Sequence, residues 1–276
     1  MTRAVIAVMM GGCAILLACD GSAPTGVGPS GTDVRKETLV ADDFESGTLS
    51  AWQDGVDPVR HRVITDAASA HAGNRYLSVS YPIGRDGGWL THFLATQSDS
   101  LYVSYYVRFP QEWRGGTKLI GFYGSRADDQ WSAFGKASLC PNGTDFFAAM
   151  LVADAGGDPG PARFYTYYPA MTREPDGVTC WGRFGNGSET YTAPLTLSRG
   201  TWHHIEFAVT LNTPGRADAR QVFWLDGIER GSWSGFSFRD SEILRLNAVQ
   251  LTFSAAVDPA AREVHVDDLV VTERRP

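Results

Sequence analysis

The chain lacks the sequence signatures of several large enzyme classes. It has no zinc-ligand spacing, no phosphate-binding glycine loop, no Gly-x-Ser-x-Gly elbow and no dinucleotide-binding fingerprint. Positive charge is also in deficit, because 24 Lys and Arg residues stand against 31 Asp and Glu residues and give a formal net charge of −7. The sequence therefore argues against nucleotide-dependent and metalloprotease chemistry, and against general binding to nucleic acid or anionic lipid.

Long hydrophobic runs are scarce as well. The main one, residues 4–17, is shorter than the ~20 residues that a membrane-spanning helix needs. It follows Arg3 and ends in Leu-Leu-Ala directly before Cys19. This order predicts a lipoprotein signal peptide at residues 1–18 and a lipidated Cys19, so that the exported protein is held at a bacterial membrane, on the periplasmic side or the cell surface, by its acyl chains alone. The alternative is an ordinary signal peptide, or a spanning helix, that happens to contain a cysteine.

Cysteine is rare, with four residues in the whole chain. Cys13 would be removed with the signal peptide and Cys19 would carry lipid, which leaves Cys140 and Cys180. Because disulfides persist in exported proteins, we predict that these two are bonded. Two buried free thiols are the alternative.

Helical periodicity is weak along the rest of the chain, whereas short runs rich in Val, Tyr, Phe, Trp and Thr recur between turn residues. Residues 19–38 are rich in Gly, Pro, Ser and Thr and are predicted to form a flexible tether. Residues 39–274 are predicted to form one all-β domain, a two-sheet antiparallel β-sandwich of the jelly-roll type. The clearest strands are predicted at residues 75–81, 101–109, 146–152, 163–168, 202–211, 221–225, 248–253 and 263–271.

Alternation along these strands predicts which side chains face the core. In residues 202–211, Ile205 and Phe207 share the apolar side and His204 takes the other. In residues 101–109, Tyr106 and Arg108 lie on a side that is aromatic and polar, which is typical of a wet surface. A curved sheet with such a face could offer a concave groove.

Several short motifs, taken in order, resemble the concanavalin A-like jelly rolls and, within them, bacterial polysaccharide lyases of the alginate and glucuronan type. These motifs are residues 42–47 (DDFESG), 105–110 (YYVRFP), 115–121 (GGTKLIG), 164–169 (FYTYYP), 201–206 (TWHHIE) and 266–269 (VDDL). The resemblance implies β-elimination at a uronic acid, with Lys118 holding the carboxylate and with Tyr165 and Tyr167 as acid and base. A tyrosine base needs positive charge nearby to lower its pKa from about 10, and Arg163 or Lys118 could supply it.

One departure from the lyase pattern is marked. Where these lyases have a Ser-x-Arg pattern on the strand between the lysine and the tyrosine pair, residues 145–151 contain neither serine nor arginine. Arg108, Arg126 or Arg163 could replace the missing cation. A polysaccharide-binding protein without catalysis therefore stands slightly ahead of the lyase as the predicted function, with a uronic-acid-containing polymer as the expected partner.

Further residues are candidates for binding this polymer. Tyr106, Arg108, Arg163 and His204 are predicted to contact substrate, although His203 and His204 point to opposite faces and cannot easily bind one metal ion together. Exposed tryptophans stack on sugar rings, and five lie in or near predicted loops, although structural packing is the favoured alternative for each of them taken alone. Two tryptophans in strands are expected in the core. The loop residues are Trp89, Trp113, Trp131, Trp181 and Trp233, and the strand residues are Trp202 and Trp224.

A metal site is suggested near the two ends of the predicted domain. The first and last strands of such jelly rolls are often neighbours, so Asp43 could meet Asp267 or Asp268 and hold a structural calcium ion. Solvated carboxylates or turn caps are the alternative. No cofactor is required by the implied reaction.

Overall fold

The computed structural model describes residues 38–182, 187–254 and 262–276. All of these belong to one compact unit, Lys36–Pro276. The predicted signal peptide, Cys19 and nearly all of the predicted tether lie outside the described residues. The described part of the chain contains no helix that is long and apolar enough to cross a membrane.

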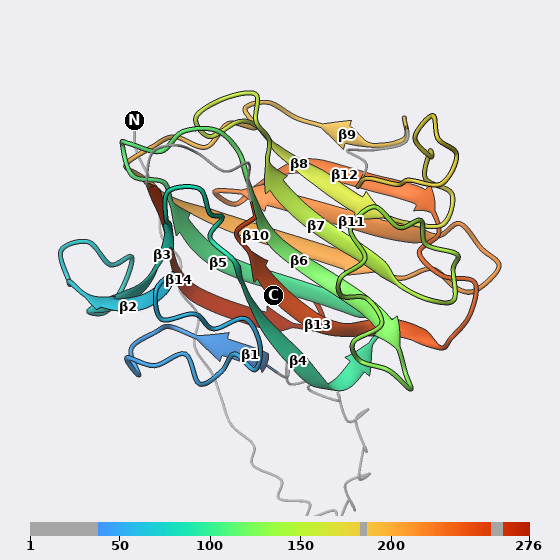
Figure 1. The fold of residues 1–276 in the computed structure, drawn as a ribbon, viewed down its shortest axis with the longest axis horizontal. Coiled ribbons are helices and arrows are strands. Elements are labelled where there is room, and N and C mark those ends of the chain that lie inside the picture. Colours follow the sequence, from blue (N-terminus) through green and yellow to red (C-terminus); the bar gives the residue numbers. More distant parts are fainter. Residues whose placement is uncertain (1–37, 183–186, 255–261) are drawn as a thin grey trace, which may run out of the picture. The chain divides into compact units, whose positions relative to one another are not determined.

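Two antiparallel sheets make up the domain (Figure 1). The larger sheet has nine strands, in the order β2 (His61–Thr65), β3 (Arg75–Tyr81), β14 (Arg262–Thr272), β5 (Ser100–Arg108), β10 (Trp202–Thr210), β11 (Ala219–Leu225), β12 (Ile228–Phe236) and β9 (Thr190–Tyr191), with β1 (Thr38–Asp42) paired to β14. The smaller sheet has the order β4 (Trp89–Ser98), β13 (Leu244–Thr252), β6 (Thr117–Arg126), β7 (Phe147–Ala153) and β8 (Ala162–Tyr167). The predicted all-β jelly-roll sandwich is confirmed.

The hydrophobic core lies between the two sheets. Ile205 and Phe207 of β10 are fully buried, as the alternation predicted. Phe122 of β6 stacks on Phe207 across the interface, with 5.5 Å between the ring centroids. Gly124 of β6 is required by this packing, since a Cβ there would lie 1.9 Å from the ring of Phe147 on β7. Contacts of this kind fix how the smaller sheet sits and therefore how its outer face is presented.

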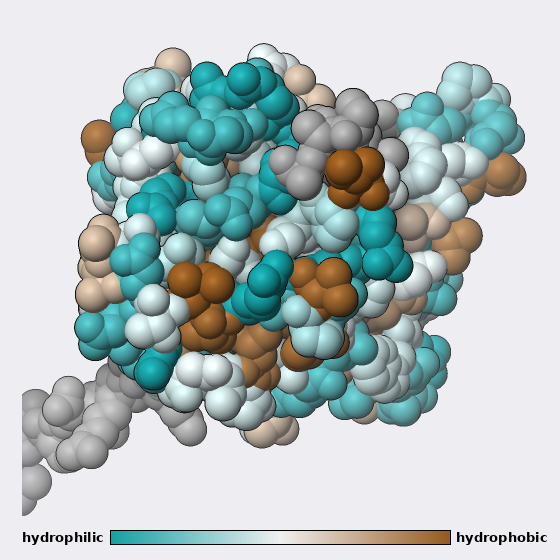
Figure 2. Space-filling model, turned by 60° about the vertical axis from the view of Figure 1, so that its left-hand side comes forward, coloured by the Kyte–Doolittle hydropathy of each residue, from teal (hydrophilic) through white to brown (hydrophobic). Residues whose placement is uncertain are grey.

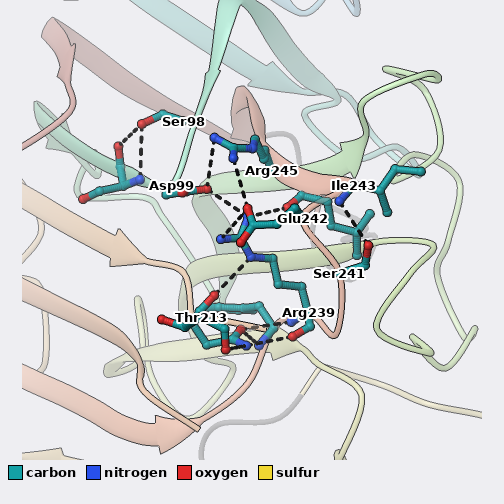
Figure 3. A network of polar contacts seen from close by, with 12 residues as sticks. Ser98, Asp99, Thr213, Arg239, Ser241, Glu242, Ile243 and Arg245 are labelled. Atoms are coloured by element: carbon teal, nitrogen blue, oxygen red, sulfur yellow. Dashed lines mark hydrogen bonds and ion pairs between the residues drawn. The ribbon is translucent and has the colours of Figure 1, made fainter. Parts of the chain in front are cut away.

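A buried arginine ties the two sheets together at one end (Figure 3). The Arg239 guanidinium donates to the Asp99 carboxylate at 2.9 Å, to the main-chain oxygen of Leu244 at 2.8 Å and to that of Asn212 at 3.1 Å. Asp99 joins β4 to β5, Asn212 follows β10, and Leu244 begins β13. One cation therefore satisfies groups at strand ends from both sheets, which is how a buried charge is tolerated.

The surface in Figure 2 is mostly hydrophilic, with hydrophobic side chains in separate small patches. Scattered apolar residues of this kind are normal for a folded domain. Among the described residues, Trp89, Trp131 and Trp181 are the exposed tryptophans, with 43%, 48% and 46% of their surface accessible. Two of these three border the pocket described next.

Candidate functional site

The outer face of the smaller sheet is the floor of a pocket of about 510 Å³. This volume lies within the ~300–1,000 Å³ that is usual for ligand pockets. Because side chains alternate along a strand, one side of β13, β6, β7 and β8 faces the pocket, and an irregularity in β6 between Lys118 and Ile120 brings Lys118 to the same side as Tyr123. The residues on this side are Gln250, Thr252, Lys118, Tyr123, Ala148, Met150 and Tyr167. The floor is therefore largely apolar and aromatic, with few polar groups.

Lys118 brings a positive charge into this pocket. Its Nζ lies 5.2 Å from the centroid of the Tyr165 ring on β8. Among the described residues, no hydrogen bond or ion pair engages the Lys118 ammonium group. Burial lowers the pKa of Lys118, and the nearby Asp86 carboxylate partly offsets this effect. Lys118 is thus a partly desolvated cation that is available to an anionic ligand.

Tyr165 and Tyr167 stand next to each other on β8. Their rings meet edge to face with 5.9 Å between the centroids. Burial raises the pKa of Tyr167, and Tyr165 raises it further. Tyr123 on the pocket floor has its pKa raised to about 12, also by burial, and its hydroxyl donates to the Gln250 amide oxygen at 2.9 Å. Tyr167 and Tyr123 therefore keep their protons at neutral pH and can act as hydrogen-bond or proton donors.

A disulfide bond holds two loops against this tyrosine pair. Cys140 and Cys180 are bonded, as predicted, and the Cys180 amide donates to the Ser138 oxygen at 3.0 Å. The main chains of Ser138 and Gly182 lie close enough to the Tyr167 hydroxyl to oppose the rise in its pKa. A Cβ at Gly182 would lie 2.3 Å from the Tyr165 ring, so the loop packs directly on that ring. The covalent bond therefore fixes the surroundings of both tyrosines.

Trp89 stands at one rim of the pocket in a fixed orientation. Its indole N–H donates to the Asp54 carboxylate at 2.8 Å. Gly55 has a φ of +85° and packs under the indole, where a Cβ would lie 2.4 Å from the ring. A partly exposed ring with its polar edge already anchored is suited to stacking on a sugar.

The other predicted cations do not enter the pocket. Arg163 lies on the same side of β8 as the tyrosines, but its Nε donates to the Asp154 carboxylate at 2.8 Å and its guanidinium lies over the Tyr191 ring at 5.6 Å. Arg126 is bound by Asp128 at 2.6 Å. Lys118 is consequently the predicted cation that the structure places beside Tyr165.

Tyr106, Arg108 and His204 lie on the outer face of the larger sheet, where they do not line the pocket. The Tyr106 ring stacks on His71 at 3.4 Å and on His204 at 4.7 Å, and Arg108 lies over the Trp202 ring at 5.0 Å. These residues extend from the opposite sheet of the sandwich, so they do not share the pocket of Lys118. Any contact of theirs with a ligand stays a prediction.

The aspartates of the predicted metal site already have protein partners. Asp268 Oδ2 lies 2.6 Å from Nδ1 of His71, and Asp43 accepts the Glu45 amide at 3.1 Å. Asp267 is fully buried, and burial raises its pKa to about 6. Among the described residues, no group of three or more His, Cys, Asp or Glu side chains could hold a metal ion. The calcium site therefore stays an untested prediction.

The two strand tryptophans differ from the prediction, and the loop tryptophans are partly buried and partly exposed. Trp113 and Trp233, expected in loops, are fully buried, whereas Trp202 and Trp224 are half-buried on the outer face of the larger sheet. Sequence reasoning overestimated the core share of strand tryptophans because a strand has two faces and only one of them meets the other sheet.

Several pocket residues were not predicted from the sequence, among them Lys136, Met150 and Gln250. Met150 and Gln250 lie on strands whose inner and outer faces are both apolar or buried, so alternation gave no signal. Lys136 lies in a loop, where no periodicity exists. The sequence offered one clue to Lys136, namely that the chain has only three lysines.

Comparison with known proteins agrees with this geometry. Residues 75–254, which include β3 to β13 and every pocket strand, match the family Polysaccharide lyase 14. The chain belongs to this family. Among curated proteins, no significant match was found.

Solved structures with the same fold include several lyases. The alginate lyase Aly36B is 17% identical, with a TM-score of 0.60 over 87% of this chain and 93% of that one. The PL-14 alginate lyase of Aplysia kurodai is 16% identical, with a TM-score of 0.63 over 86% of this chain and 100% of that one. The endo-beta-1,4-glucuronan lyase of Trichoderma reesei is 14% identical, with a TM-score of 0.56 over 86% and 96%. At these identities the likeness establishes the fold that the family shares.

Proposed function

We propose that this protein is a polysaccharide lyase that cleaves a uronic-acid-containing polymer by β-elimination. The observation that carries the proposal is the Lys118 ammonium group over the Tyr165 ring, with Tyr167 beside Tyr165, where Lys118 and Tyr167 line a pocket on the outer face of the smaller sheet. The position of the three residues on neighbouring parts of one sheet face supports their acting on one sugar.

Lys118 is assigned to the uronate carboxylate. A carboxylate that enters a largely apolar pocket must be neutralised, and the C5 proton becomes acidic only when the adjacent carboxylate charge is offset. Lys118 has no competing partner among the described residues, and a bound carboxylate would favour its charged form. The Lys118 charge therefore has the location and the sign that the substrate needs.

Tyr165 and Tyr167 are assigned to the two proton transfers. Tyr165, whose ring lies beneath the Lys118 ammonium group that would hold the carboxylate, is the base that removes the C5 proton. The electron pair left on C5 forms the C4–C5 double bond while the bond from C4 to the glycosidic oxygen breaks. Tyr167, whose raised pKa keeps it protonated, donates a proton to the departing oxygen. No water is consumed in this step.

Two solved structures with the same fold support the choice of substrate. Two solved complexes of Aly36B variants contain an alginate trisaccharide and an alginate tetrasaccharide, and the variants replace a lysine together with either a methionine or a tyrosine. Residues of the same three types, Lys118, Met150 and Tyr167, line the pocket here. Alginate and glucuronan are both polymers of uronic acids, so we propose this class and leave the sugar to experiment.

Polysaccharide binding without catalysis is the second candidate. It is favoured by Ala148 and Met150, which face the pocket on the strand where the lyase pattern has serine and arginine. A lyase with this floor relies on Lys118 as the cation at the reacting sugar. A binding protein would need no base at all.

The test follows ultraviolet absorbance of the unsaturated uronate while the purified protein is incubated with alginate or polyglucuronate. We expect an increase with the native protein and a ~10²- to 10⁴-fold lower rate with Tyr167→Phe, because the proton donor is lost. Tyr191→Phe is the matched control, since Tyr191 packs under Arg163 outside the pocket. Binding of these polymers without any gain in absorbance would overturn the lyase in favour of the binding protein.

A further inference from the structure

We propose that the pocket has a second uronate subsite, in which Lys136 binds the carboxylate of the sugar next to the reacting one and Trp131 stacks on its ring. The ligand class is then a polymer with consecutive uronic acids. This inference rests on the proposed function, because it takes the site of Lys118, Tyr165 and Tyr167 as the reacting position.

Lys136 is a second pocket cation without a protein counter-ion. It lies in the loop between β6 and β7 and lines the pocket. Among the described residues, no hydrogen bond or ion pair involves its side chain, and its Nζ lies 6.0 Å from the centroid of the Phe146 ring. No atom lies within 4 Å of a Cβ placed on the adjacent Gly135, so there is open space beside Lys136. A half-buried ammonium group next to free space favours an anionic ligand.

The two cations lie at opposite ends of one row of aromatic rings. Lys118 lies over Tyr165, and the Tyr165 ring meets that of Tyr167. The Tyr167 ring is 6.2 Å from the Phe146 ring, over which Lys136 lies. The proposed acid and base therefore stand between two positive charges. A chain bound along this row presents one carboxylate to Lys118 and another to Lys136.

Trp131 supplies the apolar surface that the second sugar needs. Its ring is packed edge to face against Phe93 at 4.6 Å and Phe134 at 5.7 Å, and Phe134 in turn stacks on Tyr123 of the pocket floor at 4.9 Å. These contacts hold the indole from behind while 48% of its surface stays accessible. An aromatic ring held in this way stacks on a sugar at little cost in side-chain entropy.

The pocket thus contains two pairs of one tryptophan and one lysine. Trp89, Trp131, Lys118 and Lys136 all line it, and we assign Trp89 with Lys118 to the reacting sugar and Trp131 with Lys136 to the next one. Each pair offers a flat apolar surface and a positive charge, which match the ring face and the carboxylate of a uronic acid. Two such pairs select consecutive uronates over a uronate flanked by neutral sugars.

The experiment compares the native protein with Lys136→Met on two substrates, polyglucuronate and the same polymer after partial carboxyl reduction, so that most remaining uronates have neutral neighbours. On polyglucuronate we expect the KM of Lys136→Met to be about three- to tenfold higher than that of the native protein, because one charge-assisted contact is lost. The kcat should not change. On the reduced polymer the two proteins should have the same KM. Lys136→Arg should recover most of the affinity, and Arg220→Met, which removes an exposed cation from β11, should have no effect.

An equal KM for the native protein and Lys136→Met on polyglucuronate would overturn the inference, as would the same KM increase on both substrates. If the native protein releases no unsaturated product, the proposed function fails by itself. The subsite is then decided by calorimetric titration of a glucuronate trisaccharide, in which Lys136→Met must weaken binding by the same three- to tenfold factor relative to Arg220→Met. Undiminished binding in that titration would also overturn the inference.

Discussion

At the scale of single residues, ion pairing decides which of the predicted cations is available to bind a substrate carboxylate. Lys118, Arg126 and Arg163 are each a cation in the sequence, but Asp128 binds Arg126 and Asp154 binds Arg163. The Lys118 ammonium group is attracted by the Asp86 carboxylate, but it forms no hydrogen bond or ion pair among the described residues. The sequence singled out Lys118 through its motif, yet it could not show that Arg126 and Arg163 are already paired with carboxylates.

The lowered pKa of Lys118 gives a prediction for the pH dependence of activity. The charged form of Lys118 is the one that binds a carboxylate, so kcat/KM should fall as pH rises through its pKa, which burial places below the usual value for lysine. In Lys118→Arg the cation stays charged at all accessible pH, and the alkaline limb should move upward. Tyr167 does not set this limb, because its pKa is raised.

The measurement is kcat/KM on polyglucuronate between neutral and alkaline pH for the native protein, Lys118→Arg and the control Arg220→Met. An alkaline limb that stays in place in Lys118→Arg would assign it to another group. If the arginine does not fit and activity is lost, Lys118→Met should lose the same activity while Arg220→Met keeps the native profile.

At the scale of strands and loops, alternation located the strands that have one polar face. Strands β3, β5, β10 and β14 fall close to their predicted ranges. β4 and β6 were not predicted. β6 contains Gly121 and Gly124, which weaken a strand pattern although Gly124 is required by the close approach of Phe147. β7 is buried on both faces, so it could be found as a strand but its pocket side could not be recognised.

The loops joined by the disulfide give a prediction for both stability and activity. Cys140 and Cys180 are 40 residues apart, and replacing both with serine should lower the free energy of unfolding by about 4 kcal/mol on the chain-entropy view. Where the variant is still folded, kcat should fall, because the loop ends at Ser138 and Gly182 no longer hold Tyr165 and Tyr167. Urea unfolding measures the first effect and product absorbance the second.

The control for this variant is its own melting curve, which defines a temperature at which the native protein and the variant are both fully folded. Equal kcat values at that temperature would show that the disulfide stabilises the domain without positioning the tyrosines. The positioning role would then be withdrawn, and the assignments of Lys118 and Tyr167 would be unaffected.

At the scale of the whole molecule, the sandwich separates two chemically rich surfaces. One outer face contains the pocket with Lys118, and the other contains the stack of His71, Tyr106 and His204. From the sequence, residues of both faces were predicted to contact the same polymer. The core between the sheets, which includes Phe122 and Phe207, keeps the two faces apart.

The location of the molecule gives the last prediction. We propose that the domain is exported and anchored through lipid on Cys19, where polymeric sugars are available. Replacing Cys19 with alanine should move the protein from the membrane fraction to the soluble fraction, because the acyl chains that stabilise attachment at about 0.8 kcal/mol per buried CH2 are missing. Fractionation with immunodetection measures this. A Cys19→Ala protein that stays in the membrane fraction would contradict the anchor.

The sequence by itself determined the fold class, the disulfide and the lysine and tyrosines of the candidate site. Local alternation, cysteine count and short motifs are properties of the chain that do not depend on where other segments lie. Only the tertiary structure decided that Arg163 is paired with Asp154, that Tyr106 and His204 belong to the opposite face, and that Lys136 and Trp131 reach the pocket. Those facts depend on contacts between residues far apart in the chain, which the register and packing of two sheets set.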